Sequence, residues 1–281
     1  MWRPEFVRIL HGYLSLQSGM RAVDFGSGTG FATRLAASKI GPKGQLVCID
    51  QDRNLLTAGK KLAHRERLMK TIHMVQGDAY IAPLPLGWAD LAMCQGLLSN
   101  VTHPLKIIAE MTRVVKKGGM VAAIEPVGMK TLVDPEDEAL TRLQLRSWNA
   151  YREGSRRLLG EDKDIGFKLP SLFLKVGLTD IQMDGYLETI LFCDDRYNER
   201  DLMRFLKDRF IVNSSEANGK STAEMVRDLS YGCGGMAPAE ARRIRKKLVT
   251  RLRPLIRNMD KLRGDASVLY AARVIVRGRK R

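Results

Sequence analysis

The chain has 281 residues, 44% of them hydrophobic, and a formal net charge of +16 from 47 Lys plus Arg against 31 Asp plus Glu. This length and composition predict one compact domain with an insertion. No apolar run approaches the roughly 20 residues that a membrane span requires, and the N-terminal residues MWRPEFVRIL lack the layout of a signal peptide, so we expect a cytoplasmic protein without a membrane span.

Alternating apolar and amphipathic stretches fill the first 125 residues, which predicts β-α-β units around a parallel sheet. The expected strands are residues 22–25, 45–49, 71–76, 91–94 and 120–124. The expected helices between them are residues 32–39, 53–64 and 104–115. A further helix is expected from Pro135 to about Leu159, because acids occupy its first turn.

The remaining chain predicts two closing strands, residues 178–186 and 268–276. Between them we expect a helical insertion over about residues 199–262, broken at residues 231–235. The sequence contains neither repeats nor a low-complexity linker, so we expect residues 1–281 to form a single domain.

Basic residues concentrate in the segment 240–263, which has ten Lys or Arg residues against two acids. Apolar residues recur there at helical intervals, so the segment predicts a helix with one packed face and one cationic face. A solvated surface is the ordinary interpretation of such a face. Contact with nucleic acid stays open as an alternative.

Cysteine and histidine spacing gives no sign of a metal site. The four cysteines contain no C-x-x-C pair, and the four histidines lie in separate segments. We therefore expect reduced thiols, no disulfide framework and no bound metal. The cysteines are Cys48, Cys94, Cys193 and Cys233.

The most informative segment is VDFGSGTGF, residues 23–31. A short apolar strand ends in Asp24, glycines follow at Gly26, Gly28 and Gly30, and a helix begins at once. Glycines at alternate positions let the backbone turn tightly and approach a ligand, and the start of a helix offers free N–H groups. The segment therefore predicts a cofactor-binding loop.

The spacing of the glycines decides among cofactors. A dinucleotide fingerprint would require Gly or Ala where this chain has Phe31, and a P-loop would require G-K-S or G-K-T. The pattern D-x-G-x-G-x-G instead resembles the first motif of class I S-adenosylmethionine-dependent methyltransferases. The block 110–126 and the two closing strands resemble the same family, in its small-molecule, quinone-biosynthesis-like branch, and the helical insertion is the least matched part.

This resemblance implies a doubly wound α/β fold with a seven-stranded, mostly parallel, Rossmann-like sheet, and S-adenosylmethionine as the cofactor. In the family an acid closing the second strand binds the ribose hydroxyls, and Asp50 matches it. A second acid after the third strand meets the adenine amino group, which Asp78 matches, and Asp24 matches the acid that helps to hold the methionine end. The remaining expected cofactor-binding residues are Gly26, Ser27, Gly28, Gly30, Gln51, Ala79 and Gln95.

Methyl transfer needs the acceptor, the methyl carbon and the sulfur to be in line, so proximity and desolvation supply most of the catalysis. A phenol or an acidic carbon as acceptor must also lose a proton. His103 and His11 are the candidate general bases.

We expect a small-molecule acceptor. The alternatives are an RNA or protein methyltransferase that uses the basic 240–263 helix, motivated by the charge of +16, and a cofactor-binding protein without turnover. The sequence leaves open which atom is methylated and whether the chain forms a dimer.

Overall fold

The computed structural model describes residues 4–196, 198–206 and 235–281. Their contacts divide into two compact units. Unit 1 comprises Met1–Val127, Asp164–Gly185 and Arg273–Arg281, and unit 2 comprises Gly128–Lys163 and Tyr186–Ala272. The single domain over residues 1–281 stays a prediction. Much of the predicted insertion, residues 207–234, lies outside the described residues.

Parallel strand pairing organises unit 1. Strand β1 pairs with β2 and β4, β2 pairs with β3, and β4 pairs with β5, all in parallel. The predicted β-α-β pattern is therefore confirmed. The strands are β1 (Arg21–Phe25), β2 (Gln45–Asp50), β3 (Ile72–Gln76), β4 (Ala89–Gln95) and β5 (Val115–Val133).

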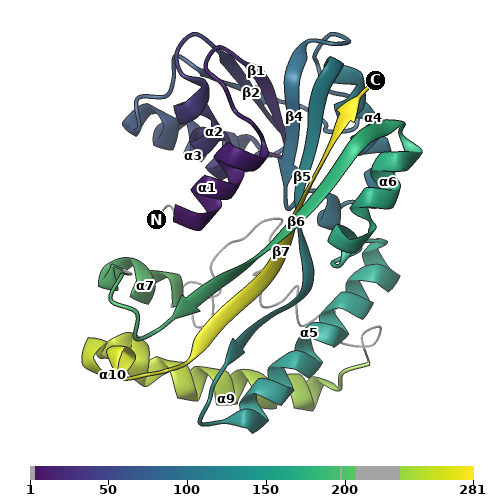
Figure 1. The fold of residues 1–281 in the computed structure, drawn as a ribbon. Coiled ribbons are helices and arrows are strands. Elements are labelled where there is room, and N and C mark those ends of the chain that lie inside the picture. Colours follow the sequence, from purple (N-terminus) through teal and green to yellow (C-terminus); the bar gives the residue numbers. More distant parts are fainter. Residues whose placement is uncertain (1–3, 197, 207–234) are drawn as a thin grey trace. The chain divides into compact units, whose positions relative to one another are not determined.

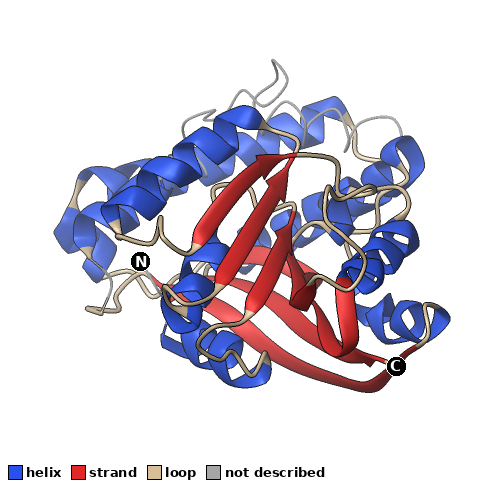
Figure 2. Ribbon diagram, turned by 90° about the horizontal axis from the view of Figure 1, so that it is seen from above, coloured by secondary structure: helices blue, strands red, loops and turns tan. Residues whose placement is uncertain are grey.

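Two further strands, β6 (Leu178–Leu191) and β7 (Val268–Lys280), complete a sheet of order β3-β2-β1-β4-β5-β7-β6 (Figure 2). Strand β7 runs antiparallel to β6, since Thr179 contacts the carbonyl of Arg279 while the N–H of Phe192 donates to the carbonyl of Ser267. The predicted seven-stranded, mostly parallel α/β sheet is thus confirmed. Strands β5, β6 and β7 each contribute residues to both units.

Helices cover both faces of the sheet within unit 1. Figure 1 shows α1, α2 and α3 on one side of its strands and α4 and α6 on the other. Local sequence explains their starts: Asp52 caps α3 by accepting from the N–H of Asn54 at 2.7 Å, and Pro104 occupies the first turn of α4. The elements are α1 (Pro4–Tyr13), α2 (Phe31–Ile40), α3 (Arg53–Arg65), η1 (Leu98–Asn100), α4 (Pro104–Val114), η2 (Ile165–Lys168) and α6 (Leu169–Lys175).

Unit 2 contains α5 (Glu138–Leu159), α7 (Glu199–Leu206), α9 (Pro238–Arg257) and α10 (Met259–Arg263). Its apolar cluster consists of Leu132, Phe192, Leu202, Leu252, Leu255, Ile256, Leu262 and Leu269. The two closing strands and the helical pattern near residues 199–206 and 238–263 agree with the prediction.

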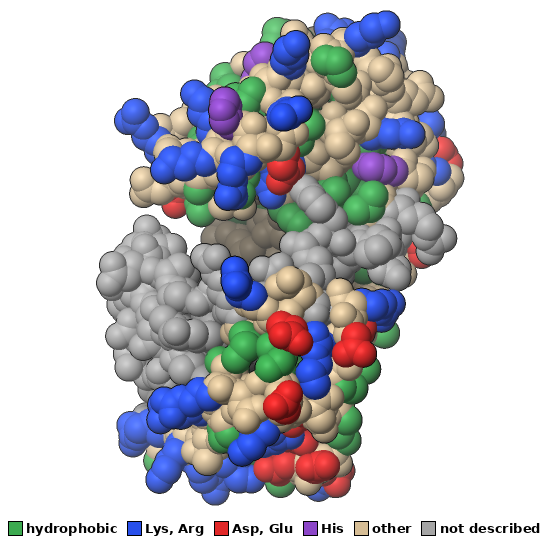
Figure 3. Space-filling model, turned by 90° about the vertical axis from the view of Figure 1, so that its left-hand side faces the viewer, with side chains coloured by type: hydrophobic (Ala, Val, Ile, Leu, Met, Phe, Trp, Pro, Cys, Tyr) green, Lys and Arg blue, Asp and Glu red, His purple; other side chains and the backbone are tan. Residues whose placement is uncertain are grey.

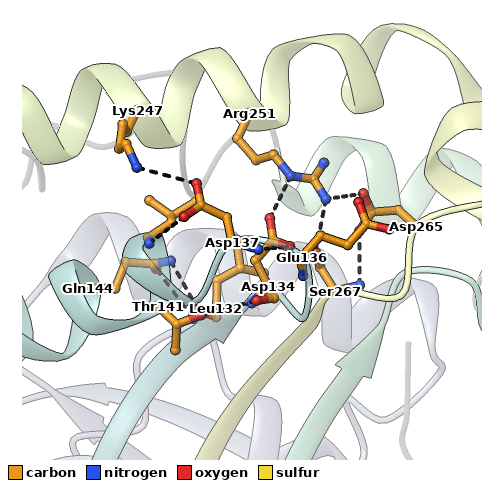
Figure 4. Close-up of polar contacts among 11 residues, drawn as sticks. Leu132, Asp134, Glu136, Asp137, Thr141, Gln144, Lys247, Arg251, Asp265 and Ser267 are labelled. Carbon is orange, nitrogen blue, oxygen red and sulfur yellow. Dashed lines mark hydrogen bonds and ion pairs between the residues drawn. The ribbon is translucent and has the colours of Figure 1, made fainter.

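A buried ionic network fixes α9 within unit 2 (Figure 4). The guanidinium of Arg251 bonds to Asp134, whose side chain is fully buried, at 2.6 Å and to Asp265 at 2.5 Å. Asp134 also accepts from two backbone N–H groups, those of Glu136 and Asp137. Because two carboxylates share one cation, removal of Arg251 would leave both buried acids without a cationic partner.

Strand β5 is much longer than the predicted 120–124. Its pairing with β4 is shifted between Ala89 and Leu91, so that Val115 and Met120 flank a bulge that contains Gly118 and Gly119. A bulge accommodates residues that would otherwise interrupt a strand. Helix α1 was not predicted at all.

Among the described helices, none combines the length and the apolar composition of a membrane-spanning segment. No group of three or more potential ligands in the described part of the chain could hold a metal ion. The described cysteines are free thiols, buried at Cys48 and Cys94 and partly buried at Cys193, and Cys233 lies outside the described residues.

Candidate functional site

Unit 1 brings the predicted cofactor residues to one edge of its sheet. In the strand register, Asp24 lies opposite Cys48 of β2 and Met93 of β4. Asp50 and Gln95 are the last residues of β2 and β4. Ligands of open α/β sheets bind at this carboxyl edge, so the acids and the glycine loop share the position that a cofactor would require.

The glycine loop depends on left-handed backbone conformations. Gly26, Gly28 and Gly30 have φ values of 62°, 56° and 72°. A Cβ on Gly26 would also lie 2.7 Å from Cδ1 of Leu97, whereas a Cβ on Gly28 would meet no atom within 4 Å. Gly26 is therefore favoured by its positive φ and by the nearby side chain of Leu97, while the space beside Gly28 is open to a ligand.

Asp50 anchors this loop through its carboxylate. One oxygen accepts from the N–H of Gly28 at 2.7 Å, and the other accepts from the N–H of Asp52 at 2.9 Å. The side chain stays partly exposed, so its carboxylate oxygens keep lone pairs for hydroxyl donors. Asp50 can thus hold the loop and a diol together.

Asp24 has an unused acceptor inside the protein. Its side chain is 1% exposed, and Oδ2 accepts from the hydroxyl of Thr33 at 2.5 Å. Oδ1 has no hydrogen-bond partner among the described residues, and neither does the buried hydroxyl of Ser27. Burial raises the pKa of Asp24 to about 7, an effect that the bond from Thr33 opposes and the charge of Asp50 reinforces. A cationic ligand near Oδ1 would favour the ionised carboxylate.

Arg34 braces the loop from the first turns of α2, a role that the sequence did not reveal. Its guanidinium donates to the carbonyls of Thr29 and Gly30 at 2.6 and 3.0 Å and pairs with Glu66 at 3.1 Å. A Cβ at Gly59 of α3 would lie 2.8 Å from the Thr29 carbonyl oxygen. The loop is thus held on two helices.

Three further predicted residues flank Asp50. Asp78 follows β3, is exposed, and accepts from the N–H of Tyr80 at 2.9 Å. Gln51 is exposed, its carbonyl accepting from Gln76 at 3.1 Å, and Ala79 is partly buried. The backbone bond from Gly77 to the Asp50 carbonyl, 3.0 Å, keeps the ends of β2 and β3 together.

Glu125 is a second buried acid at this edge, and it was not among the site residues predicted from the sequence. It is fully buried and accepts from the N–H groups of Leu98 and Ser99 at 2.8 and 3.3 Å. Burial raises its pKa to about 7, although those bonds and the charge of Arg273 oppose the rise. Glu125 therefore holds the turn after Leu97, whose side chain lies close to Gly26. The sequence signal that could have identified Glu125 is its position directly after the apolar run MVAAI.

The two candidate bases lie in different surroundings. His103 is exposed at the start of α4, and its backbone N–H donates to the hydroxyl of Tyr80 at 3.3 Å, beside the segment of Asp78. His11 lies on α1, where Nε2 is 3.0 Å from the carbonyl oxygen of Leu35 in α2. His103 thus contacts the segment that follows β3, whereas His11 connects α1 to α2.

Comparisons with known proteins identify relatives of this chain. Residues 23–123 match the Methyltransferase domain family. This match and the methyltransferase relatives support a class I S-adenosylmethionine-dependent methyltransferase. It is 26% identical over 197 residues, 66% of this chain and 80% of the relative, to a demethylmenaquinone methyltransferase of Geobacillus sp. (strain WCH70).

Solved structures resemble the methyltransferase in fold. The YcgJ protein of Bacillus subtilis has a TM-score of 0.58 at 14% identity, covering 99% of each chain. The [4+2]-cyclase SpnF has a TM-score of 0.52 at 17% identity, covering 98% of this chain and 80% of its own. Because these likenesses concern the fold, the reaction of this methyltransferase depends on its family and its site.

Proposed function

We propose that the protein transfers a methyl group from S-adenosylmethionine to a small hydroquinone-type acceptor. The similarity to a demethylmenaquinone methyltransferase over 197 residues supports this acceptor class. The observation that carries the proposal is the unused, buried Oδ1 of Asp24 beside a glycine loop that Asp50 anchors. A buried acceptor without a partner is costly unless a ligand supplies the donor.

The residues present fit the cofactor. Asp24 would accept from its ammonium group, Asp50 would bind the ribose hydroxyls, and Asp78 would meet the adenine amino group. The loop glycines would allow close approach of the backbone. We propose that Ser27, Gln51, Ala79 and Gln95 complete the lining.

The cofactor's sulfonium supplies an activated methyl group, so the chain has to align the acceptor and receive a proton. For a hydroquinone, loss of a hydroxyl proton makes a ring carbon nucleophilic. The bound cofactor would supply its methyl group to that carbon and leave as the neutral thioether, and the displaced ring proton would pass to the base or to solvent. His103, exposed at the end of the β4–α4 connection, is the base that we favour, and His11 is the second candidate.

Methyl-labelled cofactor tests this proposal. The protein is incubated with a water-soluble naphthohydroquinone, with RNA and with a protein mixture, and the label is followed into each fraction. We expect the label in the small molecule and a slower reaction in His103→Ala than in His11→Ala. Label in RNA or protein would favour the macromolecular alternative, and cofactor binding without turnover would favour a silent binding protein.

A further inference from the structure

Helix α9 presents a line of cations on one face. Arg242, Arg243, Lys246, Arg253 and Arg257 are all exposed, and we call these five residues the α9 stripe. At 3.6 residues per turn four of them fall within about 60° of one another, and Arg243 adjoins them. With a rise of about 1.5 Å per residue the stripe is about 22 Å long.

The stripe differs from the basic surface of α5 in its pairing with acids among the described residues. None of its five side chains forms an ion pair with another residue that the structure describes. On α5, by contrast, Arg142 pairs with Glu138 at 2.7 Å and Arg156 with Glu153 at 2.6 Å. Acids are therefore available to arginines on a neighbouring helix and not to the stripe.

The opposite face of α9 is already packed. Leu252, Leu255 and Ile256 belong to the apolar cluster of unit 2, and Ile244 packs with Ala150 and Met236. The apolar face of α9 is therefore not available for insertion into a membrane. A partner of the stripe has to be recognised through charge, and the association should be reversible and sensitive to salt.

We propose that the α9 stripe docks the protein on an anionic lipid bilayer. A bilayer presents phosphates over a plane, so cations that share one side of a helix can each meet a headgroup. Nucleic acid is the poorer fit, because α9 and α10 carry no aromatic side chain on which a base could stack. The choice of lipid also rests on the proposed function, since an apolar hydroquinone would partition into a bilayer.

Basic side chains are not confined to α9, as Figure 3 shows Lys and Arg over both units on the face that it draws. A test must therefore separate the stripe from the total charge of +16. The stripe variant carries Arg242→Gln, Lys246→Gln and Arg253→Gln. The matched control carries Arg142→Gln, Arg146→Gln and Arg156→Gln, which removes the same charge from α5, where each arginine is paired with an acid.

Cosedimentation with vesicles of phosphatidylcholine, with and without phosphatidylglycerol, measures the binding, and thermal denaturation confirms that both variants fold. The wild type should bind only the anionic vesicles and be released by salt. The stripe variant should bind about 100-fold more weakly, at roughly fivefold for each cation removed, while the control stays within about fivefold of the wild type.

Equal losses in the two variants, or binding to neutral vesicles, would overturn the proposal. Tighter retention on RNA than on vesicles would also overturn it, if the stripe variant abolishes that retention on RNA. The vesicle assay needs no methyl acceptor, and methylation of a water-soluble hydroquinone needs no vesicle. Failure of the docking proposal is therefore distinguishable from failure of the proposed reaction.

Discussion

Asp24→Asn is expected to remove the pH dependence of cofactor binding. The cofactor's ammonium group should favour ionised Asp24, whose pKa is raised by burial to about 7. The ionised fraction rises from about one-tenth at pH 6 to about nine-tenths at pH 8, so the affinity of the wild type should rise about tenfold over that range. The variant should bind equally at both pH values, and no more tightly than the wild type at pH 6.

Calorimetric titration in two buffers with different heats of ionisation tests this directly, because wild-type binding near pH 6 should release a proton and the variant should release none. Glu125→Gln is the control for the second buried acid of the site, and it should keep a pH dependence because Asp24 still titrates. An affinity of the wild type that is constant from pH 6 to pH 8 would refute the assignment of Asp24 to a cationic part of the cofactor.

The same carboxyl groups should make the unliganded protein less stable as the pH rises. Asp24 and Glu125 have pKa values raised to about 7 in the folded chain, so between about pH 4 and pH 7 the folded state holds protons that the unfolded state has released. Gly26→Ala should lower the free energy of unfolding in urea by about 1–3 kcal/mol, because the added Cβ would contact Leu97. Gly28→Ala should lower stability less and cofactor affinity more. A larger loss of stability in Gly28→Ala than in Gly26→Ala would contradict the geometry. Arg251→Ala should cost about 3–5 kcal/mol in the same assay by leaving two buried acids unpaired, and a loss as small as that of an exposed pair would show that the network contributes little.

The sequence predicted the parts of the site that local spacing specifies. Asp24 lies near the end of β1, the loop glycines follow that strand, Asp50 is the last residue of β2, and parallel pairing brings the strand ends together. The register confirms their shared edge. Whether they bind the cofactor stays a prediction, since the hydrogen bond from Gly28 to Asp50 shows how the loop is held, not what it holds.

Long-range contacts account for most of what the sequence did not predict. Arg34 and Glu66 are 32 residues apart, and Glu125 contacts Leu98 across 27 residues, so no local pattern connects either pair. The length of β5 was missed because paired glycines usually end an element, whereas here they form a bulge.

Titration of S-adenosylmethionine into the wild type, Asp50→Ala and Asp52→Ala tests the central claim most directly. Both acids accept backbone N–H groups, but Asp52 only caps α3, whereas Asp50 also holds Gly28. We predict clear binding by the wild type, weakened by about 1–3 kcal/mol in Asp50→Ala and little changed in Asp52→Ala. No binding by the wild type, or equal losses in the two variants, would contradict the account.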